Sequence, residues 1–180
     1  MIKKAVMSIF LLTTLSACAI KPDTVEPVTG FNPEQYMGTW YEIARLDHSF
    51  ERGLTNVQAT YSLKDNGKVK VLNQGFDRDV CEMNSADGTA KFTQSPDVAQ
   101  LKVTFFWPFY GGYNVIALDK QDYNWAMIAG PSLDYLWIMS RQKDLPASVM
   151  AKLVTQAKQA GFPADDLIIV DHSKPDCLAK

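Results

Sequence analysis

The stretch from Val57 to Val71 reads VQATYSLKDNGKVKV, and it indicates the class of fold. Up to Leu63, apolar and polar residues alternate one by one, which is the period of a strand with one buried face. The segment Asp65-Asn66-Gly67 then supplies residues that adopt the backbone angles of a tight hairpin turn. The alternation resumes at Val69. We therefore expect two antiparallel strands joined by a short turn.

Short alternating or apolar runs of the same kind lie on both sides of this hairpin. Because short connections favour antiparallel neighbours, the pattern predicts an all-β fold, namely an eight-stranded antiparallel up-and-down β-barrel without a free edge. One α-helix is expected over 146–160, ending at Gly161 and packed outside the barrel by an apolar stripe, followed by a short final strand at 167–170. The eight predicted barrel strands are 39–46, 57–63, 69–71, 90–93, 101–105, 113–118, 125–129 and 135–139.

The N-terminus indicates the compartment. A basic start is followed by an apolar run from Ala5 to Leu15, which is too short to span a ~30 Å hydrocarbon core and suits a secretory signal. Leu15-Ser16-Ala17-Cys18 then resembles a bacterial lipobox, in which the cysteine receives S-diacylglycerol and N-acyl groups and becomes the new N-terminus. The alternative is an ordinary signal cut nearby beside a chance cysteine. We expect 1–17 to be a removed signal peptide, 18–30 a lipidated tether and 31–180 one domain.

Composition excludes several classes of protein. The 180 residues are 47% hydrophobic and 21% charged, as in an ordinary globular domain, and the net charge is −2. An acidic balance without a basic run argues against nucleic-acid binding. The three cysteines form no CxxC motif and His48 lies far from His172, so no metal site and no cofactor is expected. No Gly-x-Ser-x-Gly motif occurs and Ser49 is merely next to His48, so we expect no catalytic residues and no enzyme.

Three motifs in order resemble the lipocalin family. Gly38-Thr39-Trp40, which follows the segment 31–36, is similar to the first lipocalin signature. Asp119 to Tyr123 resembles the second motif, and Arg141 the third. The resemblance covers residues 31–171 and implies the lipocalin barrel.

Two further segments narrow the resemblance. Residues 61–73 are similar to the apolipoprotein D branch of the family. Residues 109–118, together with the lipobox at Cys18, resemble the bacterial outer-membrane lipoprotein lipocalins of the Blc type. The resemblance and the anchor together imply a lipid-anchored protein of the outer membrane, with the barrel facing the periplasm.

Strand direction places the three motifs at one end of the barrel. Since the chain reverses at every strand, the start of strand one and the ends of strands six and eight lie at the same end. In lipocalins this is the closed end, where the arginine packs against the tryptophan, so Gly38, Trp40, Asp119, Tyr123 and Arg141 are expected to be fold residues. The connections at the opposite end, which form the open mouth, are 46–54, 77–88, 106–112 and 130–134.

Alternation along the strands predicts an apolar, aromatic interior. The resemblance implies that this interior is a binding cavity for a lipid, whereas the alternative is that the same side chains fill the barrel as a core. The residues expected at the lining and mouth are Ala44, Ala59, Tyr61, Val71, Phe92, Val103, Phe105, Tyr110, Tyr113, Val115, Met127, Trp137 and Met139.

The mouth segment Phe105-Phe-Trp-Pro-Phe-Tyr110 holds five aromatic residues, which predicts an exposed apolar patch. It is interpreted as a lipid portal, a homodimer interface or a lid folded inward. The resemblance implies a membrane-anchored protein that stores or transports fatty acids or phospholipids, with lysophospholipids favoured, for envelope maintenance. The alternative is an interaction protein whose barrel is filled and whose aromatic segment binds a partner. The charges at the mouth leave the choice between a zwitterionic headgroup and a carboxylate open.

Besides Cys18 the chain has two cysteines, which could pair with each other. If Cys18 is lipidated, Cys81 and Cys177 lie in an oxidising compartment in which disulfides persist. Many lipocalins tie their C-terminus to the barrel, and the resemblance implies a Cys81–Cys177 bridge here. Two free thiols are the alternative.

Overall fold

The computed structural model of the 180-residue chain describes residues 20–173, 175 and 177. The predicted signal peptide and Cys18 lie outside the described residues. No helix in the described part of the chain is both long and apolar enough to cross a membrane.

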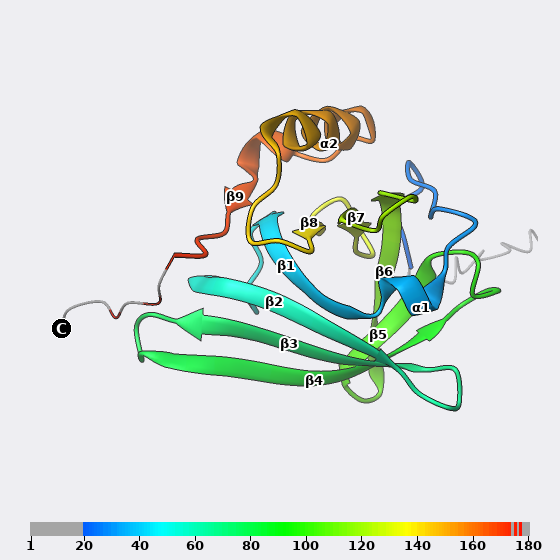
Figure 1. The fold of residues 1–180 in the computed structure, drawn as a ribbon, viewed down its shortest axis with the longest axis horizontal. Helices are drawn as coiled ribbons and strands as arrows, with labels where there is room; N and C mark the ends of the chain where they lie inside the picture. The colour runs from blue at the N-terminus through cyan, green and yellow to red at the C-terminus, as the bar shows by residue number, and fades with distance from the viewer. Residues whose placement is uncertain (1–19, 174, 176, 178–180) are drawn as a thin grey trace, which may run out of the picture.

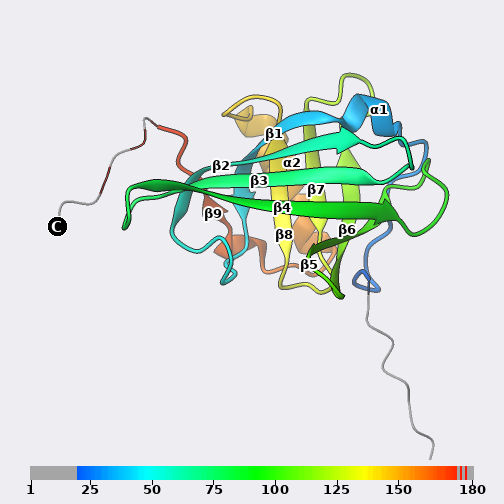
Figure 2. The same cartoon turned by 90° about the horizontal axis from the view of Figure 1, so that it is seen from below.

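Eight strands form a closed antiparallel barrel, as the sequence predicted (Figures 1 and 2). The strands follow one another around the barrel in chain order from β1 to β8, and β1 pairs with both β2 and β8. The short β9 adds to β1 from outside the barrel. The elements are α1 (Pro33–Tyr36), β1 (Gly38–Arg45), β2 (Leu54–Leu63), β3 (Val69–Asp77), β4 (Glu82–Phe92), β5 (Gln100–Phe106), β6 (Phe109–Leu118), β7 (Trp125–Ala129), β8 (Leu136–Ser140), α2 (Ala147–Gln159), the 3-10 turn η1 (Ala164–Asp166) and β9 (Ile168–Ile169).

Strand β4 begins eight residues earlier than predicted. The register with β3 runs without interruption from Asp77 opposite Glu82 to Val69 opposite Ala90. The first six residues of β4 are exposed, so they carry no apolar alternation that would indicate a strand. Gly88, at the end of the predicted 77–88 mouth connection, is a strand residue, and a Cβ atom there would lie 2.8 Å from the ring of Phe105. The glycine therefore makes room for an aromatic side chain.

The closed end is built around Trp40, which is completely buried. Its indole Nε1 donates to the carbonyl oxygen of Tyr36 over 2.8 Å. The guanidinium of Arg141 lies 3.9 Å from the centre of the Trp40 ring. At Gly38 the backbone has φ +93° and a Cβ would meet Arg141 at 3.3 Å, so this position accepts only glycine without strain.

The other two motif residues complete this end of the barrel. The hydroxyl of Tyr123 accepts a hydrogen bond from the backbone N–H of Asn32, the residue that caps α1. The Asp119 carboxylate accepts one from the backbone N–H of Asn124 across the β6–β7 turn. Both contacts fasten connections at the closed end.

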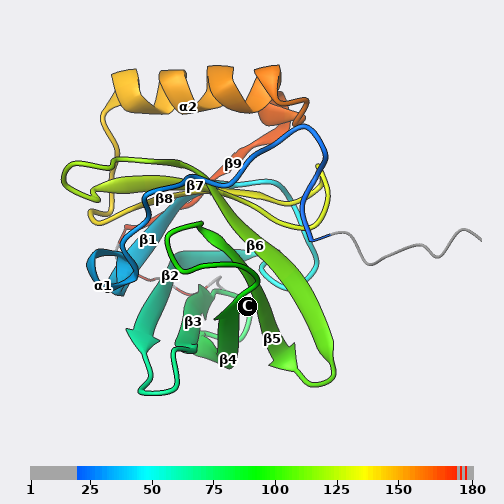
Figure 3. The ribbon, with the colours of Figure 1, turned by 90° about the vertical axis from the view of Figure 1, so that its right-hand side faces the viewer.

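Helix α2 covers the outer face of the barrel, above β7 and β8 in Figure 3. Its buried residues, Leu153 and Ala157, pack into a second apolar cluster together with Met127 and Ile138. The barrel wall is therefore apolar on both faces under this helix.

The described part of the predicted tether is packed against the barrel. Val25 is only 4% exposed. The backbone N–H of Val28 donates to the carbonyl of Val115, and the Asn114 side chain donates to the carbonyl of Ile20. A Cβ at Gly112 would lie 1.7 Å from that Ile20 oxygen. The two valines and these hydrogen bonds hold the described part of the segment that was predicted to be a tether.

Cys81 occupies the tight β3–β4 connection and is bonded to Cys177 in the C-terminal tail, with the two Cα atoms 5.1 Å apart. The contact joins the tail to the end of the long β3–β4 hairpin.

Candidate functional site

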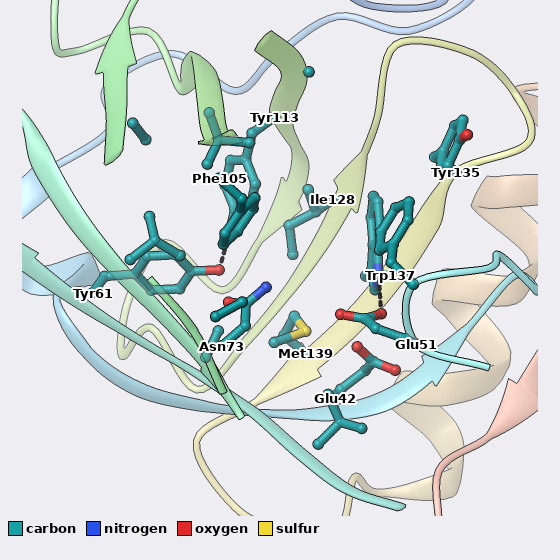
Figure 4. A pocket seen from close by; sticks show the side chains of 18 of the residues that line it. Glu42, Glu51, Tyr61, Asn73, Phe105, Tyr113, Ile128, Tyr135, Trp137 and Met139 are labelled. Carbon is teal, nitrogen blue, oxygen red and sulfur yellow. Dashed lines mark hydrogen bonds between the residues drawn. The ribbon is translucent and has the colours of Figure 1, made fainter. Parts of the chain in front are cut away.

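The barrel encloses a cavity of about 830 Å³, within the usual range for ligand-binding pockets (Figure 4). Its lining comes from the barrel strands and from mouth residues such as Phe50 and Pro131. Ten of the thirteen residues that the sequence predicted at the lining and mouth line this cavity. They are Ala59, Tyr61, Val71, Phe92, Val103, Phe105, Tyr110, Tyr113, Trp137 and Met139.

Three residues expected to line the cavity do not. Met127 and Ala44 belong to the cluster under α2 on the outer face of the barrel. On β7 the inward residue is Ile128, which pairs with Trp137. On β1 a register shift between Glu42 and Ala44 turns Ala44 outward. The sequence could not show which residues of these two strands face inward, because α2 makes both faces of β7 apolar and because a bulge interrupts the alternation of β1.

Val115 faces the interior but lies in the packed core rather than the cavity. It is completely buried in the same apolar cluster as Trp40 and Tyr36. Side chains therefore fill the barrel around Trp40 at its closed end, whereas the cavity lies beyond them.

A chain of three tyrosine hydroxyls crosses the boundary between core and cavity. The hydroxyl of Tyr113 donates to that of Tyr61 over 2.9 Å and is bonded to that of Tyr36 over 2.7 Å. Burial raises the pKa of all three phenols, so they remain protonated at neutral pH. The innermost part of the cavity is thus uncharged.

Two carboxyl groups in the cavity were not predicted as site residues. Glu42, on β1, is 2% exposed, and Arg45 Nη1 donates to its Oε1 over 2.7 Å. Glu51 lies in the β1–β2 connection, where its Oε2 accepts from Trp137 Nε1 at 3.0 Å and lies 3.0 Å from His48 Nε2. Figure 4 shows both carboxyls pointing into the cavity beside Trp137. The one sequence signal that could have identified Glu42 as a cavity residue is its position two residues after Trp40, on the inward face of β1.

The two carboxyls differ in their protonation. Burial and the nearby Glu51 carboxylate raise the pKa of Glu42 well above its usual value, despite Arg45. Burial alone would also raise the pKa of Glu51, but hydrogen bonds from His48 and Trp137 lower it below its usual value. Glu51 is therefore ionised at neutral pH, whereas Glu42 keeps its proton to a higher pH than a solvated carboxyl group does.

The predicted aromatic patch is exposed at the mouth. Phe106 and Trp107 are 76% and 78% exposed, and the Phe106 ring stacks on that of Phe109. Because these side chains are exposed, the described conformation is not a lid folded inward. The ammonium groups of Lys91 and Lys102 each lie 5.3 Å from the centre of the Tyr110 ring beside the patch.

A closed eight-stranded barrel, sealed at one end by a stacked tryptophan and arginine and hollow at the other, defines the lipocalin class of binding proteins. The family model for the lipocalin-like domain matches residues 31–172. The chain therefore belongs to the lipocalin-like family.

Curated relatives cover nearly the whole chain. It is 40% identical to outer membrane lipoprotein Blc of Vibrio cholerae, over 94% of this chain and 99% of the relative. It is 46% identical to outer membrane lipoprotein Blc of Escherichia coli strain K12, over 93% of this chain and 94% of the relative. Apolipoprotein D of Macaca fascicularis is 38% identical over 67% of this chain and 66% of that protein.

Solved structures share the fold. Insecticyanin of the tobacco hornworm Manduca sexta superposes with a TM-score of 0.69 at 21% identity, covering 87% of this chain and 88% of that one. The cockroach allergen Per a 4 superposes with a TM-score of 0.66 at 22% identity, covering 84% of this chain and 94% of that one.

Proposed function

We propose that this protein is a lipid-anchored lipocalin of the outer membrane that binds one lipid chain in its barrel, for storage or transport during envelope maintenance. The observation that carries the proposal is the cavity of about 830 Å³, which is open beyond the packed closed end and lined mainly by apolar and aromatic residues. The ligands we propose are fatty acids and phospholipids, with lysophospholipids preferred because a single chain suits one cavity.

The family and the relatives support this function. Lipocalin-like membership points to binding rather than to catalysis. Relatives that match almost end to end are named outer membrane lipoproteins, and this chain has Leu-Ser-Ala-Cys at 15–18. We propose that Cys18 carries the lipid anchor, and two or more acyl chains give the firm attachment that one chain does not.

The energetics are sufficient for micromolar or tighter binding. Burying roughly twelve to sixteen CH₂ groups at ~0.8 kcal/mol each gives a gross driving force near 10 kcal/mol. Loss of rotational and translational freedom and ordering of the ligand remove several kcal/mol of this.

Titration with a lysophospholipid tests the binding. We expect saturable binding by calorimetry and a change in the emission of Trp137, which lines the cavity. A Val103→Trp variant should weaken binding because the larger side chain occupies cavity space. An Ala151→Trp variant is the matched control, since Ala151 is exposed on α2. No saturable binding by the unchanged protein would contradict the proposal, as would equal affinities of the two variants once circular dichroism shows both to be folded.

Membrane fractionation tests the anchor. A Cys18→Ser variant should lose lipid modification and remain uncleaved or be released as a soluble species. A Ser16→Ala variant keeps the cysteine and a small residue before it, so it should be processed normally. A Cys18→Ser protein that is still cleaved and sediments with the outer membrane would contradict the anchor.

The exposed aromatic segment supports a second candidate function. Phe106 and Trp107 offer a contact surface for a partner or a second copy of the chain. The filled barrel that was part of this alternative is not found, because the cavity is open. Sedimentation of the detergent-solubilised protein, compared with a Trp107→Ser variant, distinguishes a homodimer held by this segment from a monomer.

A further inference from the structure

The charged groups that line the cavity are unevenly distributed. Among the described residues, Glu42, Glu51 and Asp77 line it with carboxyl groups, whereas Arg52 is the one basic residue in the lining. Arg52 is already bonded to Asp47 outside the cavity, through Nε at 3.0 Å and Nη2 at 2.7 Å to the same carboxylate oxygen. An anionic ligand therefore finds no unpaired cation in this lining.

The basic side chains in contact with the two glutamates, Arg45 and His48, do not line the cavity; His48 Nε2 lies 3.0 Å from Glu51 Oε2. Arg45 is 2% exposed and does not line the cavity. Its Nη1 donates to Glu42, and its Nη2 donates to the backbone carbonyl of Glu51 over 2.7 Å. Arg45 is fixed by these bonds, so the charged atoms that a ligand meets are those of the carboxyl groups.

Aromatic rings border the same carboxyls on the mouth side. Trp137 is held by its hydrogen bond to Glu51, and the ring centroids of Trp137 and Tyr135 are 6.2 Å apart. The ring of Phe50, which is 64% exposed, lies parallel to that of Tyr135 at 6.2 Å. All three rings line the cavity. Aromatic faces beside a carboxylate are favourable surroundings for an ammonium group.

We propose that Glu51 and Glu42, with the Trp137 ring, form a subsite for the ammonium group of the ligand. The cavity then selects single-chain amphiphiles with a cationic or zwitterionic amine headgroup over a fatty acid with the same tail. This inference rests on the proposed binding function and specifies its ligand. It makes Glu51 a specificity-determining residue.

The position of the subsite agrees with a tail directed inward. Glu51 lies in a mouth connection, whereas Val71, Phe92 and Ile128 line the cavity around the uncharged tyrosine hydroxyls. A tail placed there leaves the headgroup at the glutamates. A fatty acid in the same position would bring its carboxylate next to the Glu51 carboxylate, and two like charges close together in a partly buried site disfavour each other.

Three amphiphiles with the same tail test the proposal: tetradecyltrimethylammonium, tetradecanol and tetradecanoate. Their affinities are measured by calorimetry at neutral pH, below the concentrations at which they form micelles. We expect the ammonium compound to bind at least about tenfold more tightly than tetradecanoate, with tetradecanol between them, because one favourable and one unfavourable charge contact separate the two ions.

Removing the charge of Glu51 should remove the preference. Glu51→Gln keeps the size and an acceptor for Trp137 Nε1, and the ratio of affinities should fall below about threefold, with tighter binding of tetradecanoate. Glu82→Gln is the matched control, because Glu82 is an exposed carboxylate at the start of β4 that does not line the cavity. If Glu51→Gln does not fold by circular dichroism, Glu51→Ala, which also removes the charge, takes its place with the same expectation.

The outcomes separate this inference from the proposed function. If none of the three amphiphiles binds, the binding function itself is wrong. If all bind but tetradecanoate binds as tightly as the ammonium compound, the cavity binds amphiphiles and the ammonium subsite is wrong. An unchanged preference in a folded Glu51→Gln variant would also overturn the subsite.

Discussion

At the closed end of the barrel Arg141 donates hydrogen bonds to four backbone carbonyls, whereas in the cavity lining a buried polar atom is left without a partner. Arg141 donates to the carbonyl oxygens of Gln35, Met37 and Thr39, each over 2.8 Å, and to that of Tyr123. Within the described residues, the Oδ1 atom of Asn73, in the cavity lining, has no hydrogen-bond partner.

This difference separates stability from binding. Satisfied hydrogen bonds and close packing stabilise the folded state, but they leave nothing for a ligand to contact. Unbonded polar atoms and open volume lower stability, and a ligand can compensate for both. We therefore expect substitutions at the closed end to change the free energy of unfolding and substitutions in the cavity to change affinity.

The largest effect is expected at Trp40. Trp40→Ala should lower the free energy of unfolding by about 3–5 kcal/mol, because it leaves a large void in a buried core. Trp107→Ala at the mouth is the matched control and should change it by less than about 0.5 kcal/mol, since Trp107 is 78% exposed. Urea denaturation measures both. Similar losses for the two tryptophans would refute the contrast between the ends.

The Cys81–Cys177 bridge should have the next largest effect, because it constrains a loop with a sequence separation of 96. A Cys81→Ser, Cys177→Ser variant should lose about 2–4 kcal/mol of stability. Thiol titration of the denatured, unreduced mature protein should detect no free thiol if Cys18 is lipidated. Two titratable thiols would mean that the bridge does not form.

Arg141→Met should cost about 2–3 kcal/mol, because it leaves several backbone carbonyls without a charged donor. Lipid affinity should stay unchanged, since Arg141 does not line the cavity. Lys143→Met is the control, because Lys143 is an exposed lysine whose ammonium lies 5.7 Å from the Tyr41 ring. Denaturation together with a lipid titration tests the prediction, and it fails if affinity falls while stability holds.

The smallest effect concerns pH and Glu42. Since its pKa is raised in the folded protein, the folded state holds this proton more tightly than the unfolded state. The resulting stability is complete below the usual value of 4.5 and is lost as pH rises through the raised pKa. Glu51 acts oppositely, because its lowered pKa contributes stability that is lost when pH falls.

Glu42→Gln isolates the first of these contributions. As pH rises above 4.5, the free energy of unfolding of the variant should increase relative to that of the wild type, by ~1.4 kcal/mol for each unit by which folding raises the Glu42 pKa. Denaturation at several pH values measures the difference, with Glu82→Gln as the exposed control. Parallel pH profiles for wild type and Glu42→Gln would show that Glu42 titrates normally.

The places where the sequence failed share one cause. The start of β4 was missed because its side chains are exposed on both faces, so its strand conformation depends on pairing with β3. Met127 was placed inward because α2 makes the outer face of β7 as apolar as the inner one. Glu42 and Glu51 were not recognised as cavity residues because acidic residues in sequence are ordinarily solvated. In each case the missing information is the identity of a neighbour distant in the chain.

The sequence by itself determined the barrel. Strand alternation and hairpin turns are local patterns that predict antiparallel strands, and the order of the Gly38-Thr39-Trp40, Asp119–Tyr123 and Arg141 motifs resembles that of the lipocalin family. Only the tertiary structure decided that the barrel stays hollow above Tyr61 and Tyr113, and that two carboxyls face the hollow while Arg45 lies behind them. Volume and electrostatic environment are sums over residues from many strands, and no single segment carries them.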